Sequence, residues 1–572
     1  MRILFDSQKT DHKDPFGTLI PGQGCRLRLH IPVAVGAVKA ECILELADGP
    51  VCIRAHLKKE RTQGDYDIFS GVFSLQKPGL YFYYFCIDKP DGMFRLFKQG
   101  RDTNMEAGDR WQVTCTPADF TTPDWAKGAI IYQIFPDRFY KAGDTDLTEK
   151  LRPFAVHKDW NEDVISRPNE NGIILNNDFF GGNFRGITEK MDYIASFGTK
   201  LLYLNPICKA FSNHRYDTAD YKAPDPMLGT VDDFGAMCQV AHNRGIKVIL
   251  DGVFSHTGAK SIYFQSACAS VDSPYFSWYT FYRYPDSYNS WWGFDTLPTV
   301  NKMDRSFLHY VIDAEDSVVA HWLKLGADGF RLDVADELPD AFILRLKQRI
   351  RQIRPDALLM GEVWEDASNK IAYGIRRRYF ADGALDSIMN YPFRTAILDF
   401  IRGYDDGRQL KETVMTIAEN YPPQVLACNM NLLGSHDTVR ILTELSGDRN
   451  ALMMASFLQY TLPGSPSIYY GDEAGLQGHK DPFNRRTYPW GREDQILMEH
   501  YRQLGVMRKK YLPLRLGNIR FLQAENGRIV FCREYGGKQI TVRINRTGEY
   551  WKNLPPMGFD IWEEHNGTGA FY

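Results

Sequence analysis

The segment GFRLDVADE, residues 329–337, places an arginine and acids inside an otherwise apolar strand pattern. Side chains in a strand alternate between two faces, so Arg331 and Asp333 share one face and the apolar residues between them share the other. An arginine beside an aspartate favours the ionised carboxylate and lowers its pKa. We therefore expect Asp333 to stay charged and to serve as a nucleophile, the alternative being a structural ion pair.

Further acids and histidines stand at the ends of other apolar segments. Glu362 lies in GEVWED, His436 and Asp437 lie in LLGSHD, and Asp251 and His256 lie in DGVFSH. One acid at a strand end is usually a cap or a loop anchor. Acids and histidines at the carboxyl ends of four strands are hard to explain by stability alone, so the pattern predicts one shared site.

A charged carboxylate that faces a protonated one is the arrangement used in glycoside hydrolysis. If Asp333 attacks the sugar carbon and Glu362 protonates the leaving oxygen, the two groups should lie about 5 Å apart and the reaction should retain configuration. The apolar neighbours Val363 and Trp364 suit a general acid. A metal hydrolase is the rival interpretation, but the sequence lacks H-x-H and HExxH clusters.

The elements that must position these residues alternate between short apolar strands and amphipathic helices. Helices are predicted, for example, over 230–245, which opens on a Thr cap, and over 338–355, which stops at a proline. Eight such strands predict a closed (β/α)₈ TIM barrel over 121–256 and 308–511; a doubly wound open sheet is the alternative. The predicted strands cover 128–135, 200–207, 246–254, 329–334, 357–364, 386–392, 431–437 and 465–473.

Three further regions flank or interrupt the predicted barrel. Short alternating segments over 1–120 predict an N-terminal β-sandwich, and similar segments over 512–572 predict a C-terminal β domain. Residues 257–307 form an aromatic-rich insertion after the third strand. Its aromatic residues are expected either to build a small satellite core or, as we prefer, to offer flat apolar surfaces to a substrate.

Composition narrows the range of partners. The 572 residues carry a formal net charge of -3, which gives no basic field for nucleic acid and fits a neutral substrate. The 10 cysteines are scattered without CxxC pairs, which is typical of reduced thiols. No signal peptide or membrane span is apparent, so we expect a cytoplasmic protein without a membrane partner.

The motifs DGVFSH, GFRLDVADE, GEVWEDA and LLGSHDTVR occur in this order within about 125–511, and together they resemble the alpha-amylase family of glycoside hydrolases. The resemblance implies a TIM barrel in which Asp333 is the nucleophile and Glu362 the acid/base. Asp437 would be a third acid that binds and distorts the sugar. It also implies a substrate-binding set consisting of Arg331, His256, His436, Tyr216, His214, Asp251 and Glu337.

Within that family, IIYQIFPDRF, FFGGNFRGI and SNHRYDTADY resemble the neopullulanase, cyclomaltodextrinase and maltogenic amylase branch. This implies hydrolysis of α-1,4 bonds, with α-1,6 bonds as an additional target, in maltooligosaccharides, cyclodextrins, pullulan or starch. It also implies a starch-binding-type N-terminal module and a homodimer. A glucanotransferase or isomerase of the same family, or an inactive carbohydrate-binding subunit, remains as an alternative.

Several positions depart from the family pattern. Ser255 replaces a usual asparagine, which weakens a calcium site common in amylases. Replacements on the expected leaving-group side, at Phe330, Asp336 and Glu365, leave linkage preference open. No cofactor is required by this chemistry. Calcium is considered at a second site in the first long loop, where the oxygen ligands would come from Asp144, Asp146 and Asn183.

Overall fold

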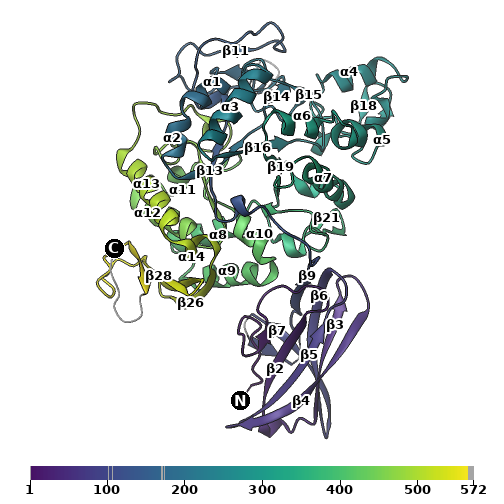
Figure 1. Ribbon diagram of the computed structural model, residues 1–572, viewed down its shortest axis with the longest axis vertical. Coiled ribbons are helices and arrows are strands. Elements are labelled where there is room, and N and C mark those ends of the chain that lie inside the picture. The colour runs from purple at the N-terminus through teal and green to yellow at the C-terminus, as the bar shows by residue number, and fades with distance from the viewer. Residues whose placement is uncertain (1, 101, 106, 169–171, 173, 565–572) are drawn as a thin grey trace. The chain divides into compact units, whose positions relative to one another are not determined.

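The computed structural model describes residues 2–100, 102–105, 107–168, 172 and 174–564. The chain divides into two compact units (Figure 1). The first consists of Met1–Thr121, Asp366–Leu385 and Glu412–Leu426, and the second of Thr122–Glu365, Asp386–Lys411 and Ala427–Tyr572. All predicted site residues lie in the second unit.

The second unit is built on a parallel sheet whose strands pair in chain order. A parallel bridge between Met389 and Met430 joins the two edges, and the amide of Asn390 donates to the carbonyl of Met430 at 2.8 Å. The sheet is therefore a closed eight-stranded barrel, which confirms the predicted fold and excludes the open sheet. Its strands are β10 (Ile130–Ile134), β13 (Thr199–Leu204), β16 (Lys247–Gly252), β19 (Gly329–Leu332), β20 (Leu358–Gly361), β23 (Ser387–Ile388), β24 (Met430–Leu432) and β25 (Ser465–Tyr469).

Helices surround this barrel (Figure 1). Helix α3 (Val231–Asn243) opens with a capping box, in which the side chain of Thr230 accepts from the amide of Asp233 and the Asp233 carboxylate accepts in return. Helix α7 (Asp340–Ile353) buries one apolar stripe, as the sequence pattern predicts. The others around the barrel in the second unit are α1 (Phe184–Glu189), α2 (Met191–Ala195), α6 (Val318–Leu325), α8 (Tyr391–Arg402), α11 (Ile441–Glu444), α12 (Arg449–Thr461), α13 (Gln495–Lys510) and α14 (Leu512–Leu516). Helices α9 (Arg408–Asn420) and α10 (Pro423–Cys428) lie mostly in the segment Glu412–Leu426, which belongs to the first unit.

The barrel interior changes from apolar to polar toward the carboxyl ends of its strands. Because side chains alternate along a strand, residues two positions apart point into the same interior. Apolar inward residues of the core are therefore followed by polar ones nearer the rim. The pairs are Ile131 and Gln133 on β10, Ile249 and Asp251 on β16, and Met360 and Glu362 at the end of β20.

The insertion after β16 forms a small subdomain with α4 (Ile262–Ala269), β17 (Phe281–Arg283), β18 (Ser287–Tyr288) and α5 (Arg305–Leu308). Most of its aromatic rings pack on one another; Phe264, for example, lies 4.6 Å from Tyr288 between ring centroids. Trp291 instead lies 5.4 Å from the ring of His256 and stacks on Trp292 at 4.4 Å. Most of the segment therefore forms a small core of its own, while Trp291 lies beside the predicted site residue His256.

Besides the short antiparallel pair β21 (Ile371–Ala372) and β22 (Ile375–Arg376), the first unit contains a sheet of nine antiparallel strands, coloured purple in Figure 1. One hydrogen-bonded sheet curls over its own core, because β4 pairs with β3 along its first half and with β5 along its second half, with a register shift between Lys59 and Arg61. The strands are β1 (Lys13–Asp14), β2 (Gly24–Pro32), β3 (Lys39–Leu46), β4 (Val51–Gln63), β5 (Tyr66–Ser74), β6 (Gly79–Lys89), β7 (Gly92–Gln99), β8 (Asp102–Asn104) and β9 (Trp111–Cys115).

A four-stranded antiparallel sheet follows the barrel in the second unit. It consists of β26 (Asn518–Glu525), β27 (Arg528–Tyr535), β28 (Lys538–Asn545) and β29 (Gly558–Glu564). The last residues of the predicted C-terminal domain, 565–572, lie outside the described residues. In the part of the chain that the structure describes, none of the helices has the length and apolar character needed to cross a membrane.

Candidate active site

Arg331 is the centre of the site. It lies on β19 with no exposed surface, directly beside Asp251 of β16 in the sheet register. Its Nη1 donates to Asp251 Oδ1 at 2.6 Å and to Asp333 Oδ1 at 2.9 Å, and its Nη2 contacts Glu362 Oε2 at 2.8 Å. One guanidinium therefore gathers acids from the ends of three neighbouring strands, of which the sequence pattern paired only Asp333 with Arg331.

The backbone after the predicted nucleophile turns sharply. Val334 has φ 38°, in the left-handed region that β-branched residues rarely adopt. Its amide donates to Glu362 Oε2 at 2.6 Å, while the indole Nε1 of Trp364 donates to Glu362 Oε1 at 3.0 Å. The Trp364 ring in turn stacks on Tyr391 at 3.9 Å. Both oxygens of Glu362 are thus held by donors that fix the orientation of its carboxyl group.

The expected lowering of the Asp333 pKa is wrong for this site. Burial raises the pKa of Asp333 well above its usual value; Arg331 opposes this shift, and the neighbouring carboxylates reinforce it. Burial likewise raises the pKa of Asp251, and burial and the nearby Glu362 raise the pKa of Asp437 to about 7. Since acids outnumber cations in this cluster, burial and mutual repulsion disfavour the ionisation of all of them at once.

The three predicted substrate-binding histidines are held in the neutral form. Burial lowers the pKa of His214 to about 3 and that of His256 to about 4, and it lowers the pKa of His436 well below its usual value. The carbonyl of Tyr216 lies 3.0 Å from His256 Nε2, and the hydroxyl of Ser255 lies 2.9 Å from His256 Nδ1. Because a carbonyl only accepts, His256 carries its proton on Nε2 and accepts from Ser255 at Nδ1.

A network of neutral groups covers the opposite side of the site. Gln133 Nε2 lies 3.0 Å from both Asn205 Oδ1 and His436 Nδ1. Asn205 Nδ2 donates to Tyr216 Oη at 3.2 Å, and Tyr216 Oη donates to Asp251 Oδ2 at 2.8 Å. The sequence reasoning missed Gln133 and Asn205. In the sequence, each could have been found as a polar residue inside an otherwise apolar strand pattern, YQIF for Gln133 and YLNPI for Asn205.

Asp437 joins the network from the loop after β24. His436 Nε2 lies 3.1 Å from Asp437 Oδ2 and 2.5 Å from Tyr216 Oη. Arg485, a third residue that the sequence reasoning missed, places Nη2 3.6 Å from Asp437 Oδ1 and donates from Nε to the carbonyl of His436 at 3.1 Å. The Asp437 side chain is 30% exposed, so this carboxylate remains accessible.

The remaining predicted residues lie at the edge of this cluster. His214 Nδ1 accepts from the amide of Tyr216 at 3.1 Å, which places the two side chains in a single turn. Glu337 Oε1 accepts from Trp292 Nε1 at 3.2 Å, and the Trp292 side chain is 68% exposed. All three predicted catalytic acids and all predicted substrate-binding residues therefore belong to one region of the barrel rim.

The three residues considered for calcium make other contacts. Asn183 caps α1, accepting from the amide of Gly186 at 2.8 Å, and Asp146 accepts from the amide of Thr148 at 2.9 Å. Asp144 is 94% exposed and pairs with Lys141. Among the described residues, the acids, histidines and cysteines form no group of three or more suited to hold a metal ion.

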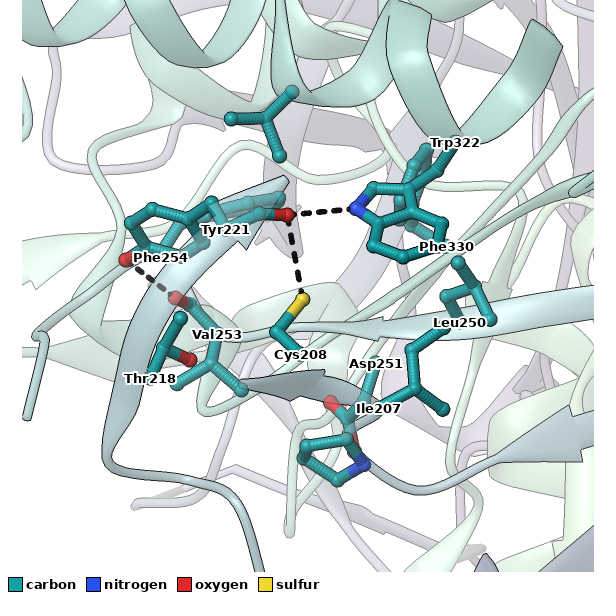
Figure 2. Close-up of a pocket in the computed structure, with 12 residues that line it drawn as sticks. Ile207, Cys208, Thr218, Tyr221, Leu250, Asp251, Val253, Phe254, Trp322 and Phe330 are labelled. Atoms are coloured by element: carbon teal, nitrogen blue, oxygen red, sulfur yellow. Dashed lines mark hydrogen bonds between the residues drawn. The ribbon is translucent and has the colours of Figure 1, made fainter. Parts of the chain in front are cut away.

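A small cavity lies behind Asp251 (Figure 2). Its volume is about 10 Å³, and the backbone carbonyl of Tyr221 on its wall accepts from Trp322 Nε1 at 2.8 Å and from Cys208 Sγ at 3.4 Å. A sugar ring needs far more space than this. The cavity is therefore part of the packing that supports Asp251, and it is too small to be the substrate site.

Comparison with known proteins agrees with this geometry. The amylopullulanase of Thermoanaerobacterium saccharolyticum is 34% identical over 95% of this chain, and the chain spans about half of that relative, 49% of its length. The cyclomaltodextrinase of Geobacillus thermopakistaniensis (strain MAS1) is 34% identical, covering 75% of this chain and 71% of the relative. The structure of the type III pullulan hydrolase from Thermococcus kodakarensis aligns with 98% of this chain and 100% of that hydrolase chain. The TM-score is 0.70 and the sequence identity is 26%.

The family profile described as "Alpha amylase, catalytic domain" matches residues 133–511, which is more than half of the chain. This range contains every acid and every hydrogen-bonded partner of the cluster around Arg331. With a closed barrel, three acids on one guanidinium and this match, the chain belongs to the alpha-amylase family of glycoside hydrolases.

Proposed function

We propose that this protein hydrolyses α-glucans with retention of configuration, and that it cleaves α-1,4 glucosidic bonds. In the first step a carboxylate oxygen of Asp333 forms a bond to the anomeric carbon. The bond to the leaving oxygen breaks, and Glu362 gives that oxygen its proton. Water then attacks the glycosyl-enzyme, Glu362 takes a proton from the water, and Asp333 leaves as a carboxylate.

The other groups of the site bind and orient the sugar in this proposal. Neutral His436 and His256 donate or accept hydrogen bonds without adding charge. Tyr216 offers a ring face for the apolar side of glucose, and Asp437 accepts hydrogen bonds from sugar hydroxyls. Trp292 and Trp364 would contact further glucose units, because each exposes a large part of its indole ring, 68% and 46% respectively.

The observation that supports this proposal best is the shared guanidinium of Arg331. It holds Asp333 and Glu362 on adjacent nitrogens, at 2.9 and 2.8 Å. A single guanidinium that bridges both carboxyl groups favours a direct attack by one of them, since an inverting enzyme needs extra room between its two acids for a water molecule. A carboxyl group of the cluster that keeps its proton supplies the acid for the same step.

Product analysis tests the proposal. The purified protein is incubated separately with pullulan, β-cyclodextrin and soluble starch, and the anomeric form of the first products is followed by proton NMR. Panose from pullulan with an initial α-anomer is the expected result. Maltotriose would indicate α-1,6 cleavage, as the amylopullulanase relatives' name suggests for those proteins. An initial β-anomer would overturn the retaining mechanism.

The closest rivals differ in what they form from the same substrates. A glucanotransferase or isomerase would lengthen or rearrange maltooligosaccharides without a matching rise in reducing ends. An inactive carbohydrate-binding subunit would form no product from any of the three glucans. Both outcomes are read from the same incubations by chromatography and a reducing-sugar assay.

Three subsidiary expectations belong to this proposal. Turnover needs no cofactor, and calcium, where it binds at Asp144, Asp146 and Asn183, has a structural role only. Dialysis against EDTA should therefore leave kcat unchanged, and a loss that calcium restores would contradict this.

The expected homodimer is checked by light scattering of the purified protein. The expected cytoplasmic location is checked by cell fractionation.

A further inference from the structure

Gln133 occupies an unusual place beneath the site. It lies on β10 with no exposed surface, and its backbone carbonyl accepts from the amide of Tyr470 at 2.9 Å. Its side-chain nitrogen reaches two groups at once, Asn205 Oδ1 and His436 Nδ1, each at 3.0 Å. An amide NH₂ carries two hydrogens and accepts none, so each hydrogen has one partner.

The rest of the network determines which way the Gln133 amide faces. Asp251 Oδ2 accepts from Tyr216 Oη, so the hydroxyl proton of Tyr216 is committed to Asp251. Tyr216 Oη then accepts from Asn205 Nδ2 at 3.2 Å. Asn205 consequently presents its carbonyl oxygen to Gln133. Gln133 therefore has to donate from its NH₂ group. His436 Nδ1 is left as an acceptor, and the imidazole proton lies on Nε2.

We propose that Gln133 is a positioning residue for glucan hydrolysis: its two N–H groups set the tautomer of His436 and, through Asn205, the orientation of Tyr216. The Nε2–H of His436 then points toward Asp437 Oδ2, 3.1 Å away, and toward Tyr216 Oη. One amide thereby aligns two substrate-facing groups before the glucan arrives. The catalytic part of this inference rests on the proposed function, whereas the tautomer does not.

Another buried glutamine in the same barrel provides a matched control. Gln459 on α12 is 1% exposed, and its Nε2 donates to the backbone carbonyls of Asn431 at 2.7 Å and Ser467 at 2.8 Å. It therefore has the same side chain, similar burial and the same number of donated bonds as Gln133. Its partners are carbonyls, which have no tautomer to set.

Kinetics compare Gln133→Met with Gln459→Met on soluble starch. Each change removes two donated hydrogen bonds and nearly preserves side-chain volume. We expect Gln133→Met to lose about 10²-fold in kcat with a smaller change in KM, because misaligned groups mainly affect the transition state. Gln459→Met should fold less stably but stay within about 3-fold of the parent kcat. Equal losses of kcat in the two variants would overturn the positioning role.

Histidine nitrogen NMR tests the tautomer without any substrate. The 13 histidines are labelled with ¹⁵N in the ring, and His436→Gln identifies the signals of His436 by their loss. In the parent protein we expect Nδ1 to be unprotonated and Nε2 protonated. In Gln133→Glu, whose carboxylate only accepts, Nδ1 should become protonated. A protonated Nδ1 in the parent protein would overturn the inference, even if a Gln133 variant failed to fold.

The two experiments separate the inference from the proposed function. If the parent protein releases no product from any glucan but shows the expected tautomer, the proposed function fails and the assignment of the His436 proton stands. If the parent protein is active and Gln133→Met remains equally active, the proposed function stands and the positioning role fails.

Discussion

The two sides of the site use different means to hold their groups. Three neighbouring strands, β16, β19 and β20, supply a charged side in which Arg331 binds Asp251, Asp333 and Glu362. The strands β24, β10 and β13 lead to a neutral side in which amides, a phenol and an imidazole exchange directed hydrogen bonds. Charge attraction tolerates changes of angle, whereas neutral hydrogen bonds depend strongly on direction.

This difference suggests a division of tasks. In the proposed mechanism, the charged side supplies the nucleophile and the acid. The neutral side has its histidine pKa values lowered by burial, so it offers fixed donors and acceptors whose pattern does not vary around neutral pH. Removing a charge should therefore alter reactivity and stability together, while removing a neutral donor should alter mainly the alignment of the substrate.

The largest effect is expected for Asp333→Asn on the charged side. The amide cannot attack the anomeric carbon, so kcat should fall by about 10⁴-fold or more. The fold should persist, since Asn has the same shape and lacks a charge that is costly to bury. Turnover of starch measures the loss of kcat, and far-UV circular dichroism checks that the fold persists. Asp124→Asn, at a 94% exposed acid of the same unit, is the control and should change neither the turnover nor the spectrum.

Arg331→Met tests whether the charged side depends on its cation. Three buried carboxylates would lose their shared partner, which should cost about 3–5 kcal/mol of unfolding free energy near neutral pH. The loss should shrink as the pH falls, because the uncompensated acids then take up protons. Urea unfolding of the variant and the parent at two pH values measures this loss of unfolding free energy. Arg345→Met, which breaks a half-exposed pair with Asp313, should cost under about 1 kcal/mol.

Asp437→Asn examines the one acid that joins the neutral side. Its raised pKa means that the folded protein holds a proton that the unfolded chain has released, so this acid favours folding at low pH. That contribution is lost as pH rises from its usual value of 3.8 toward about 7. The variant should therefore be more stable than the parent above about pH 7, by about 1 kcal/mol after allowing for solvent exposure, and equal to it in acid.

The same variant should lose about 10²-fold or more in kcat, because a carboxylate beside the sugar disappears. Thermal unfolding at several pH values and starch turnover measure the two effects. A stability gain that does not depend on pH would show that the charge of Asp437 is not its source.

The smallest effect is expected for Ser255→Ala on the neutral side. His256 would lose the hydroxyl that donates to Nδ1, a bond worth about 1 kcal/mol. Since Nε2 still donates to the carbonyl of Tyr216, the ring should keep its place. We expect KM for maltooligosaccharides to rise less than about 10-fold with kcat nearly unchanged. A larger fall in kcat would place His256 with the groups that act in the transition state.

The charged side was visible in the sequence because acids are rare inside apolar strands. Asp251, Asp333 and Glu362 stand at strand ends, and the closed barrel brings these ends together. The eight strands were predicted by the same alternation of apolar segments and helices. Gln133 and Asn205 escaped notice, because one amide in a strand is compatible with many structural roles until its partners are known.

Other features depended on distances that a linear pattern does not contain. The raised pKa of Asp333 results from burial and from acids brought by three other strands, so the local Arg331 contact alone suggested the wrong direction. The aromatic insertion divided into a small core and a pair of tryptophans beside His256. The bend of β4 between two partners, which links the halves of the predicted N-terminal sandwich into one curled sheet, was not visible either.

Closure of the barrel has a consequence for synthesis of the chain. Strand β10, which carries Gln133, pairs with β13 soon after it and with β25, the last strand of the barrel. Its contact with His436 joins residues 303 positions apart. A nascent chain that ends just after β20 already contains every acid of the charged side, together with Gln133 and Asn205, yet it still lacks His436 and Asp437. Catalytic competence would then appear only after the whole barrel has left the ribosome.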